Sequence, residues 1–305
     1  SPPPSSPPAP SSPPLLPPPP RSPPVPPLPP TPPLFPDQTL ITTPSALRAA
    51  LAGAAPGSSV VLFVPPGAVF VLSSSPLVVD GVNLTLASAG AGATLDAQLA
   101  SRCLEVRNNG SATLEHIHLW NGRVVDQPGG CALVTGPGSM LTLAHATMLA
   151  CETILDQFQP PRVTIHGGPY GEFTQASGGG VAALDGARLD VTASNFEDCR
   201  ADVYGGGVFA YGGATADLRD SHFNRCTAAL GGGVAALTAE TRVLVDRCTI
   251  VGRDSVWSVG AGLSRQCGAI GVTYDAQVDV VDSLIANQTH INGGGGFCLL
   301  SGGSS

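Results

Sequence analysis

Apolar positions repeat along the second half of the chain with a period near 27 residues. Each repeat begins at a glycine-rich triplet, and the triplets start at Gly178, Gly205, Gly231, Gly260 and Gly293. Counted from these glycines, apolar residues fall at three corresponding offsets: Val181, Val208 and Val234; Val191, Leu218 and Leu244; and Phe196, Phe223 and, with a one-residue slip, Ile250. Apolar and polar residues alternate around each of them, which predicts short strands with one buried face.

Short strands of this kind predict a solenoid. Two or three strands separated by glycine-rich turns cannot bury their apolar face alone, but stacked copies can. Helical repeats are excluded because glycine runs break helices and no segment shows a 3.6-residue period. We therefore predict an all-β fold, a right-handed parallel β-helix over residues 37–305, with coils of about 25 residues that rise about 4.8 Å each. The glycine triplets are expected at its corners, where φ is positive or coils approach closely.

The earlier part of the chain continues this register, because residues 102–106 match residues 130–134. At the N-terminal end a capping helix is expected over about residues 44–53, with Thr43 as N-cap and proline at the first helical position. Its apolar face would consist of Ala46, Leu47, Ala50 and Leu51. Residues 156–176 are interpreted as an insertion loop at one corner. No cap follows the last repeat, so either the chain continues or another subunit covers that edge.

Residues 1–36 have a different character and hold 21 of the 31 prolines. Consecutive prolines fix φ and lack backbone donors, so this segment predicts an extended polyproline II stalk. At roughly 3.1 Å per residue it would reach about 110 Å. A plain spacer, or a ligand for SH3 or WW domains in a cytosolic chain, are the alternative interpretations.

Ser-Pro-Pro or Thr-Pro-Pro units recur in this segment, at Ser1, Ser6, Ser12, Ser22 and Thr31. They resemble the hydroxyproline-rich glycoproteins of plant and green-algal walls, the extensins and pherophorin-type proteins. The resemblance implies hydroxylation and O-glycosylation of Pro2, Pro3, Pro4, Pro7, Pro8, Pro13, Pro14, Pro17, Pro18, Pro19, Pro20, Pro23, Pro24, Pro26, Pro27, Pro29, Pro30, Pro32 and Pro33. It also points to a green alga as the source.

The eight cysteines all lie outside the proline-rich segment, and none has zinc-site spacing, so disulfides and an oxidising compartment are expected. Cys103 and Cys131 occupy equivalent positions on neighbouring coils and form the first predicted pair; Cys267 with Cys298 is the second. For the others two sets stay open: Cys151–Cys199 with Cys226–Cys248, or Cys199–Cys226 with Cys151–Cys248. N-glycosylation sequons begin at Asn83, Asn109 and Asn287.

The charged and apolar residues exclude several classes of function. The chain has 14 basic residues, all arginine, and 22 acidic ones, for a net charge of −8. Nucleic-acid binding is not expected without a basic stripe or aromatic platforms. Membrane insertion is not expected either, because the most apolar stretch, residues 60–72, contains two prolines and is too short to span a bilayer. The lack of lysine excludes Schiff-base chemistry, and no cofactor beyond covalent glycans is expected.

The short helix, the segment APGSSVVLFVPPGAVFVL and the stacked glycine-triplet coils resemble the pectin-lyase-like β-helix superfamily. The Gly-Gly repeats resemble those of chlamydial polymorphic outer-membrane proteins. Many members of this superfamily are polysaccharide lyases or hydrolases, whose activity depends on particular catalytic residues. The polygalacturonase pattern is absent: the chain has no Asp-Asp pair, and His166 lies in Ile-His-Gly-Gly rather than Gly-His-Gly.

Two polar groups remain as candidates for a metal or catalytic role. Acidic residues fall on successive coils near Arg219 and Arg247, but such charges more often form a solvated face; they are Asp217, Asp220, Asp246, Asp279 and Asp282. His116 and His118 would lie on the same side of one strand, with no third ligand at matching spacing. We therefore expect no metal site and no enzyme activity.

The sequence thus favours a secreted structural glycoprotein, a subunit of an extracellular fibril, cell wall or flagellar surface. Its partners would be copies of itself or other wall glycoproteins and their glycans. The alternative is a carbohydrate-binding or adhesive module, for which aromatic side chains are available at Trp120, Trp257, Tyr170, Tyr204 and Tyr211.

Overall fold

The computed structural model describes residues 39–72, 74–156, 175–252, 268–286 and 295–300. All of them belong to the unit Pro33–Ser305. The predicted polyproline II stalk and nearly all of the predicted insertion loop lie outside the described residues. Within the described residues, no helix is long and apolar enough to cross a membrane.

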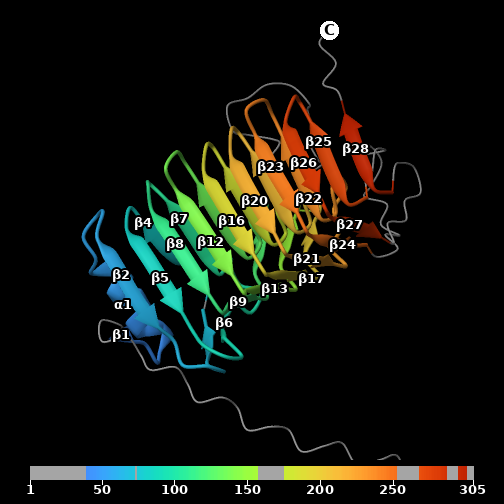
Figure 1. The fold of residues 1–305 in the computed structure, drawn as a ribbon. Coiled ribbons are helices and arrows are strands. Elements are labelled where there is room, and N and C mark those ends of the chain that lie inside the picture. Colours follow the sequence, from blue (N-terminus) through green and yellow to red (C-terminus); the bar gives the residue numbers. More distant parts are fainter. Residues whose placement is uncertain (1–38, 73, 157–174, 253–267, 287–294, 301–305) are drawn as a thin grey trace, which may run out of the picture. The chain divides into compact units, whose positions relative to one another are not determined.

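The described chain is a parallel β-solenoid of about eight coils (Figure 1), as the repeat predicted. Sheet A consists of β1 Thr39–Leu40, β2 Ser59–Phe63, β5 Asn83–Ala87, β8 Ser111–Glu115, β12 Met140–Ala144, β16 Arg188–Thr192, β20 Thr215–Arg219, β23 Arg242–Asp246 and β26 Gln277–Val281. Sheet B consists of β3 Val69–Val71, β6 Ala93–Asp96, β9 Ile117–Trp120, β13 Thr147–Leu149, β17 Asn195–Glu197, β21 His222–Asn224, β24 Thr249–Val251 and β27 Leu284–Ala286.

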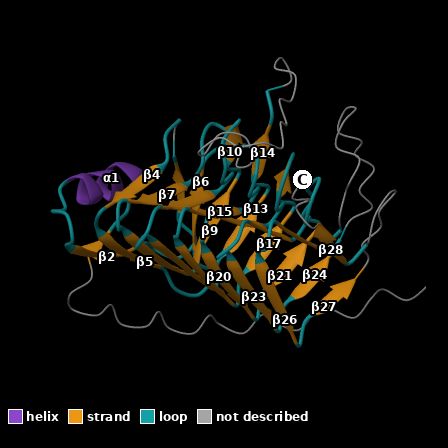
Figure 2. Ribbon diagram, turned by 90° about the horizontal axis from the view of Figure 1, so that it is seen from above, coloured by secondary structure: helices purple, strands orange, loops and turns teal. Residues whose placement is uncertain are grey.

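Two further sheets complete the coils (Figure 2). Sheet C consists of β4 Leu77–Asp80, β7 Leu104–Arg107, β11 Ala132–Thr135, β15 Val181–Leu184, β19 Val208–Tyr211, β22 Val234–Leu237, β25 Ile270–Thr273 and β28 Phe297–Leu300. The short sheet D consists of β10 Arg123–Val125, β14 Glu152–Ile154 and β18 Arg200–Ala201. A full coil adds one strand to each of sheets A, B and C, so hydrogen-bonded neighbours come from successive repeats.

Alternating side chains of the three large sheets point inward and form one continuous core. The predicted register is confirmed for Val181, Val208 and Val234, which are neighbours in sheet C. It is also confirmed for Phe196, Phe223 and Ile250 in sheet B. One alignment is wrong: Leu218 lies beside Val245, not Leu244, because the turn before β23 shifts the strand by one residue. Leu244 therefore faces outward.

The glycine triplets stand before the strands of sheet C, as expected. Gly205, the first of its triplet, has φ of 59°, a region that residues with a Cβ rarely adopt. A Cβ on Gly206 would collide with the carbonyl oxygens of Gly232 and Thr227 on the next coil. The first glycine therefore permits the turn, and the second permits close stacking of the coils.

The predicted capping helix is present as α1, Pro44–Ala52. The Thr43 hydroxyl oxygen accepts a hydrogen bond from the Ala46 backbone amide at 3.2 Å, which satisfies one free donor of the first turn. Leu47 and Leu51 are buried against the first coils, whereas Ala46 is exposed, so the buried face is narrower than predicted. At the opposite end, Phe297 and Leu299 of β28 are 40 % and 73 % exposed.

Candidate functional surfaces and the cysteine row

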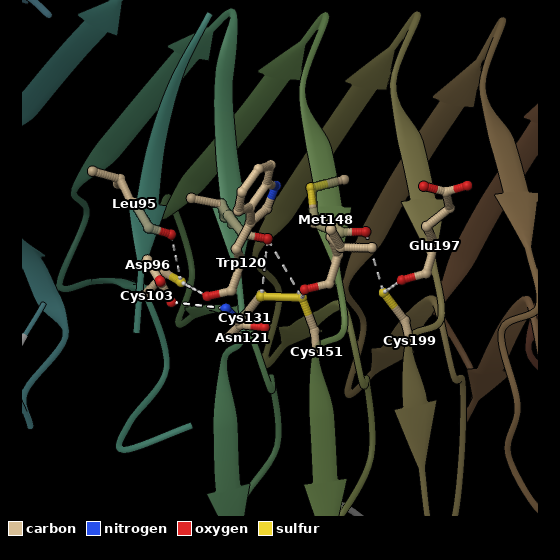
Figure 3. Close-up of a disulfide and its surroundings, with 12 residues drawn as sticks. Leu95, Asp96, Cys103, Trp120, Asn121, Cys131, Met148, Cys151, Glu197 and Cys199 are labelled. Atoms are coloured by element: carbon tan, nitrogen blue, oxygen red, sulfur yellow. Dashed lines mark hydrogen bonds between the residues drawn. A yellow bond between two sulfur atoms is a disulfide. The ribbon is translucent and has the colours of Figure 1, made fainter. Parts of the chain in front are cut away.

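Cysteines from successive coils lie in a row inside the solenoid (Figure 3). Cys131 and Cys151 form a disulfide with their Cα atoms 5.3 Å apart. Cys131 precedes β11 in sheet C, whereas Cys151 lies between β13 and β14. Both are fully buried. The disulfide therefore links the start and the end of one passage of the chain through sheets C, A and B, instead of joining equivalent positions on two coils.

The predicted Cys103–Cys131 disulfide is wrong, although the two residues are neighbours in the stack. The Cys103 backbone amide donates a hydrogen bond to the Cys131 carbonyl oxygen at 2.8 Å. Side chains at in-register positions of parallel strands point the same way, whereas Cys151 stands at a different position of the coil, with its Cα 5.3 Å from that of Cys131. Cys103 remains a buried thiol whose Sγ lies 3.4 Å from the carbonyl oxygens of Leu95 and Trp120. Burial raises its pKa to about 12.

Both predicted sets of disulfides among the remaining cysteines are also wrong. Cys199, Cys226 and Cys248 are buried thiols, so none of the predicted pairs among them forms. Burial, and secondarily a hydrogen bond with Cys226, raises the pKa of Cys199. Cys248 belongs to a different corner, between β23 and β24, where its backbone amide donates to the Ser283 hydroxyl at 2.9 Å. Cys298 is disulfide-bonded, and its predicted partner Cys267 lies outside the described residues.

Two of the predicted N-glycosylation sites are accessible. Asn83 of β5 and Asn109, which precedes β8, both have exposed side chains. The Ser111 hydroxyl donates a hydrogen bond to Asn83 Oδ1 at 2.9 Å and leaves the side chain at the surface. The third site, Asn287, and all of the predicted hydroxyproline sites lie outside the described residues. Glycan attachment at any of these sites stays a prediction.

The predicted acidic residues line the outer face of sheet A and the corner beside it, where Arg219 and Arg247 pair with Asp217, Asp220 and Asp246. Arg247 donates to both carboxylate oxygens of Asp220, at 2.7 and 2.9 Å, and also contacts Asp246 at 2.6 Å. The first of these interactions lowers the pKa of Asp220. Asp217 and Asp279 are separated by Leu244, which lies between them in the sheet. Across the described residues, no three side chains of His, Cys, Asp or Glu gather as metal ligands.

The two candidate histidines do not share a strand face. His116 occupies the corner before β9 with φ of 53°, and its ring stacks on His145 of the next coil at 4.7 Å. His118 lies within β9, with Nε2 3.0 Å from the Ala91 carbonyl oxygen. The His116–His145 stack could not be foreseen, because the left-handed corner conformation of non-glycine residues has no strong sequence signal.

The outer face of sheet C carries a second apolar cluster. Phe209 lies between two tyrosines: its ring centroid is 5.8 Å from that of Tyr204 and 6.1 Å from that of Tyr211. The structure thus brings together two of the tyrosines that the sequence suggested, and Phe209 is an addition. Burial raises the pKa of Tyr204 to about 12. Tyr170 and Trp257 lie outside the described residues. Because this cluster is already buried, it is a second core and not an open aromatic platform.

The outer face of sheet B contains a hollow of about 440 Å³ that the sequence did not reveal. It lies over β13, β17, β21 and β24 and is lined by Thr147, Asn195, Glu197, His222, Asn224 and Thr249. In-register pairing sets these side chains in two columns along the solenoid axis. Strand alternation predicted that they face outward, but only the stacked coils show that they line one hollow.

Comparisons with known proteins add little to this description. No protein-family model and no curated protein sequence matches the chain. Among solved structures, the chain is similar to the crystal structure of Escherichia coli YbhC, with a TM-score of 0.37 and 11 % sequence identity. That similarity covers 85 % of this chain and 87 % of the other. What the chain does must therefore be argued from its own residues.

Proposed function

We propose that the chain is a secreted structural glycoprotein, a subunit of an extracellular fibril, cell wall or flagellar surface. The observation that carries the proposal is the proline-rich segment, with 21 prolines in 36 residues and recurring Ser-Pro-Pro units. Such a segment cannot form a core, but it can form a stiff, glycosylated stalk. Its likeness to extensins and pherophorin-type proteins supports a role in a wall or coat, with a green alga as the source.

The β-solenoid provides independent support. It holds a disulfide between Cys131 and Cys151, a bond that persists mainly in oxidising compartments. Sequon residues Asn83 and Asn109 are exposed, as N-glycosylation requires. Arg219 of sheet A pairs with Asp217, and Arg247 at the adjacent corner pairs with Asp220, which is typical of a structural surface and unlike a catalytic base poised for substrate.

The relative lengths of the proline-rich stalk and the solenoid support self-assembly. A stalk of about 110 Å would be longer than a solenoid of eight coils at about 4.8 Å each, so each stalk could run along neighbouring solenoids. We therefore propose that the partners are copies of this chain or other wall glycoproteins. The proposal involves no cofactor and no catalysis, and it places the chain outside the cell.

Peptide mass spectrometry of native protein tests the proposal. Trypsin should release residues 1–21 and 22–48, which together contain all the predicted hydroxyproline sites. We expect mass increments of about 16 Da per hydroxylated proline, with pentoses removable by deglycosylation. Unmodified peptides would contradict the glycoprotein role. Negative-stain images that show only monomers in native material would contradict assembly and leave the glycoprotein role intact.

A further inference from the structure

The hollow on sheet B presents polar groups that the fold does not use. Asn195 and His222 are exposed and lie side by side in β17 and β21. Neither side chain has a hydrogen-bond partner among the described residues. Asn224 Nδ2 donates to Glu197 Oε1 at 3.4 Å, which leaves Asn224 Oδ1 and Glu197 Oε2 open. Amide, imidazole and carboxylate groups arrayed in this way suit a ligand that carries many hydroxyls.

An apolar platform lies beside these groups on the same face. Trp120 of β9 is in register with Leu149 of β13, and Leu149 is in register with Glu197 of β17. The strands are about 4.8 Å apart, so the indole lies about 10 Å from the polar column along the solenoid axis. An aromatic ring packs well against a ligand ring that has an apolar face and polar groups around its edge. A ligand lying along the axis would therefore meet first an aromatic ring and then hydrogen-bonding groups.

The charges around the hollow disfavour an acidic ligand. Asp96 lies beside Trp120 in sheet B, and Glu197 lies two strands further along. The nearest guanidinium, that of Arg225, is engaged by both carboxylate oxygens of Asp198 at 2.8 and 2.6 Å. Arg225 also lies 3.8 Å from Glu197 Oε1, so both acidic side chains beside it already share this cation. An anionic polymer would thus meet the carboxylates of Asp96 and Glu197 without a free cation to pair with. A neutral ligand avoids this repulsion.

We propose that the outer face of sheet B binds a neutral oligosaccharide that lies along the solenoid axis. Trp120 stacks on one sugar ring, and Asn195, His222 and Asn224 hydrogen-bond to hydroxyl groups of the next units. The saccharide can come from two sources: a free wall glycan, or glycans on the proline-rich segment of a second copy. This inference does not rest on the structural role proposed above, because it uses only the solenoid surface.

Tryptophan fluorescence provides a direct test. The chain has two tryptophans, so Trp257→Phe in the full-length protein leaves Trp120 as the sole reporter. This variant is titrated with cellohexaose, with linear arabinohexaose and with hexagalacturonate. We expect a saturable change in emission with at least one neutral hexasaccharide and none with hexagalacturonate. No saturable change with either neutral probe, or equal binding of hexagalacturonate, would overturn the proposal.

Surface variants locate the site. His222→Ala and Asn195→Ala are each expected to weaken binding about tenfold, because each removes one hydrogen bond. Thr215→Ala, at an exposed position of sheet A, is the matched control and should bind like the parent protein. If all three variants bound equally well, the site would lie elsewhere and the proposal would fail.

The same titration separates the two sources. Glycosylated tryptic peptides 1–21 and 22–48 from native protein are compared with the same peptides after deglycosylation. Binding that requires the glycans identifies the stalk of a second copy as the source. Binding of the free hexasaccharides alone identifies an external wall glycan, and either result supports the site.

Discussion

Phe196 and Phe223 stack inside the solenoid, with ring centroids 4.5 Å apart and planes 11° from parallel. They occupy in-register positions on β17 and β21, and Ile250 takes the same position on β24. Gly180 and Gly207 lie directly against the two rings, where a Cβ would collide with them. The phenylalanine and glycine of each coil are therefore matched in size.

This stack predicts a large effect of truncation. Phe223→Ala should lower the free energy of unfolding by about 3–5 kcal/mol, because it opens a cavity between two coils. Phe223→Ile should cost much less, since the next coil already accommodates isoleucine at this position. Urea denaturation of the three proteins measures the difference. Equal destabilisation by the two substitutions would contradict the packing described here.

The second glycine of a triplet is predicted to tolerate no side chain. Gly206→Ala places a methyl group against backbone oxygens of the adjacent coil, which cannot move without breaking the stack. We expect loss of soluble protein or a greatly lowered melting temperature. Gly296→Ala is the control, because its Cβ would lie 3.8 Å from Ile285, an ordinary contact. Similar melting temperatures for the two variants would argue against close backbone contact at Gly206.

The cysteine pairing is open to direct mapping. Chymotrypsin can cut between the two cysteines, for example after Leu141, so digestion with it without reduction should give a linked peptide pair that contains Cys131 and Cys151. Cys103→Ala should leave that pair unchanged. Cys131→Ser should cost about 3 kcal/mol of unfolding free energy, the value expected for a bond that closes a loop of this size; the two cysteines are 20 residues apart. A linked pair containing Cys103 and Cys131 would refute this assignment.

The buried thiol of Cys103 predicts a dependence on alkaline pH. Its pKa rises from 9.0 to about 12 on folding because burial disfavours the thiolate. The unfolded chain therefore loses this proton at lower pH than the folded protein. The contribution to stability is complete below about pH 9 and is lost as the pH rises towards about 12.

Denaturation at several pH values, with Cys103→Ala as the matched variant, measures this effect. The decline above pH 9 should be shallower in the variant, because one of the buried thiols is gone. Iodoacetamide should label Cys103 only after unfolding. Rapid labelling of Cys103 in the folded protein at pH 8 would show that the thiol is accessible, contrary to the structure.

Most of the fold could be predicted because positions that stack in a solenoid recur at regular spacing along the sequence. Val181, Val208 and Val234 could be aligned by counting from glycines, and Thr43 with Pro44 marked the capping helix. Counting failed at Leu244, where an irregular turn changed the offset by one residue. It also failed for Cys131, whose partner lies on another corner of the same coil. Periodicity reports which residues stack in register, but not which residues at different offsets of a coil come into contact.

The functional surface was harder to foresee for a related reason. Asn195 and His222 are ordinary polar residues when considered in their own strands. They form part of a hollow only because successive coils bring them together with Glu197 and Asn224. Similarly, Phe209 gave no sequence sign that it would lie between Tyr204 and Tyr211 on the outside of sheet C.

The stacking of the coils also determines how the solenoid would carry load. Every strand pairing described here joins one coil to the next, so the interstrand hydrogen bonds run along the stacking axis. Tension along that axis would load the coil interfaces in series, and they would open one at a time. Tension across the axis would instead be carried within each coil by covalent backbone. A solenoid attached along its side would thus be stiff, and one pulled from its ends would extend stepwise.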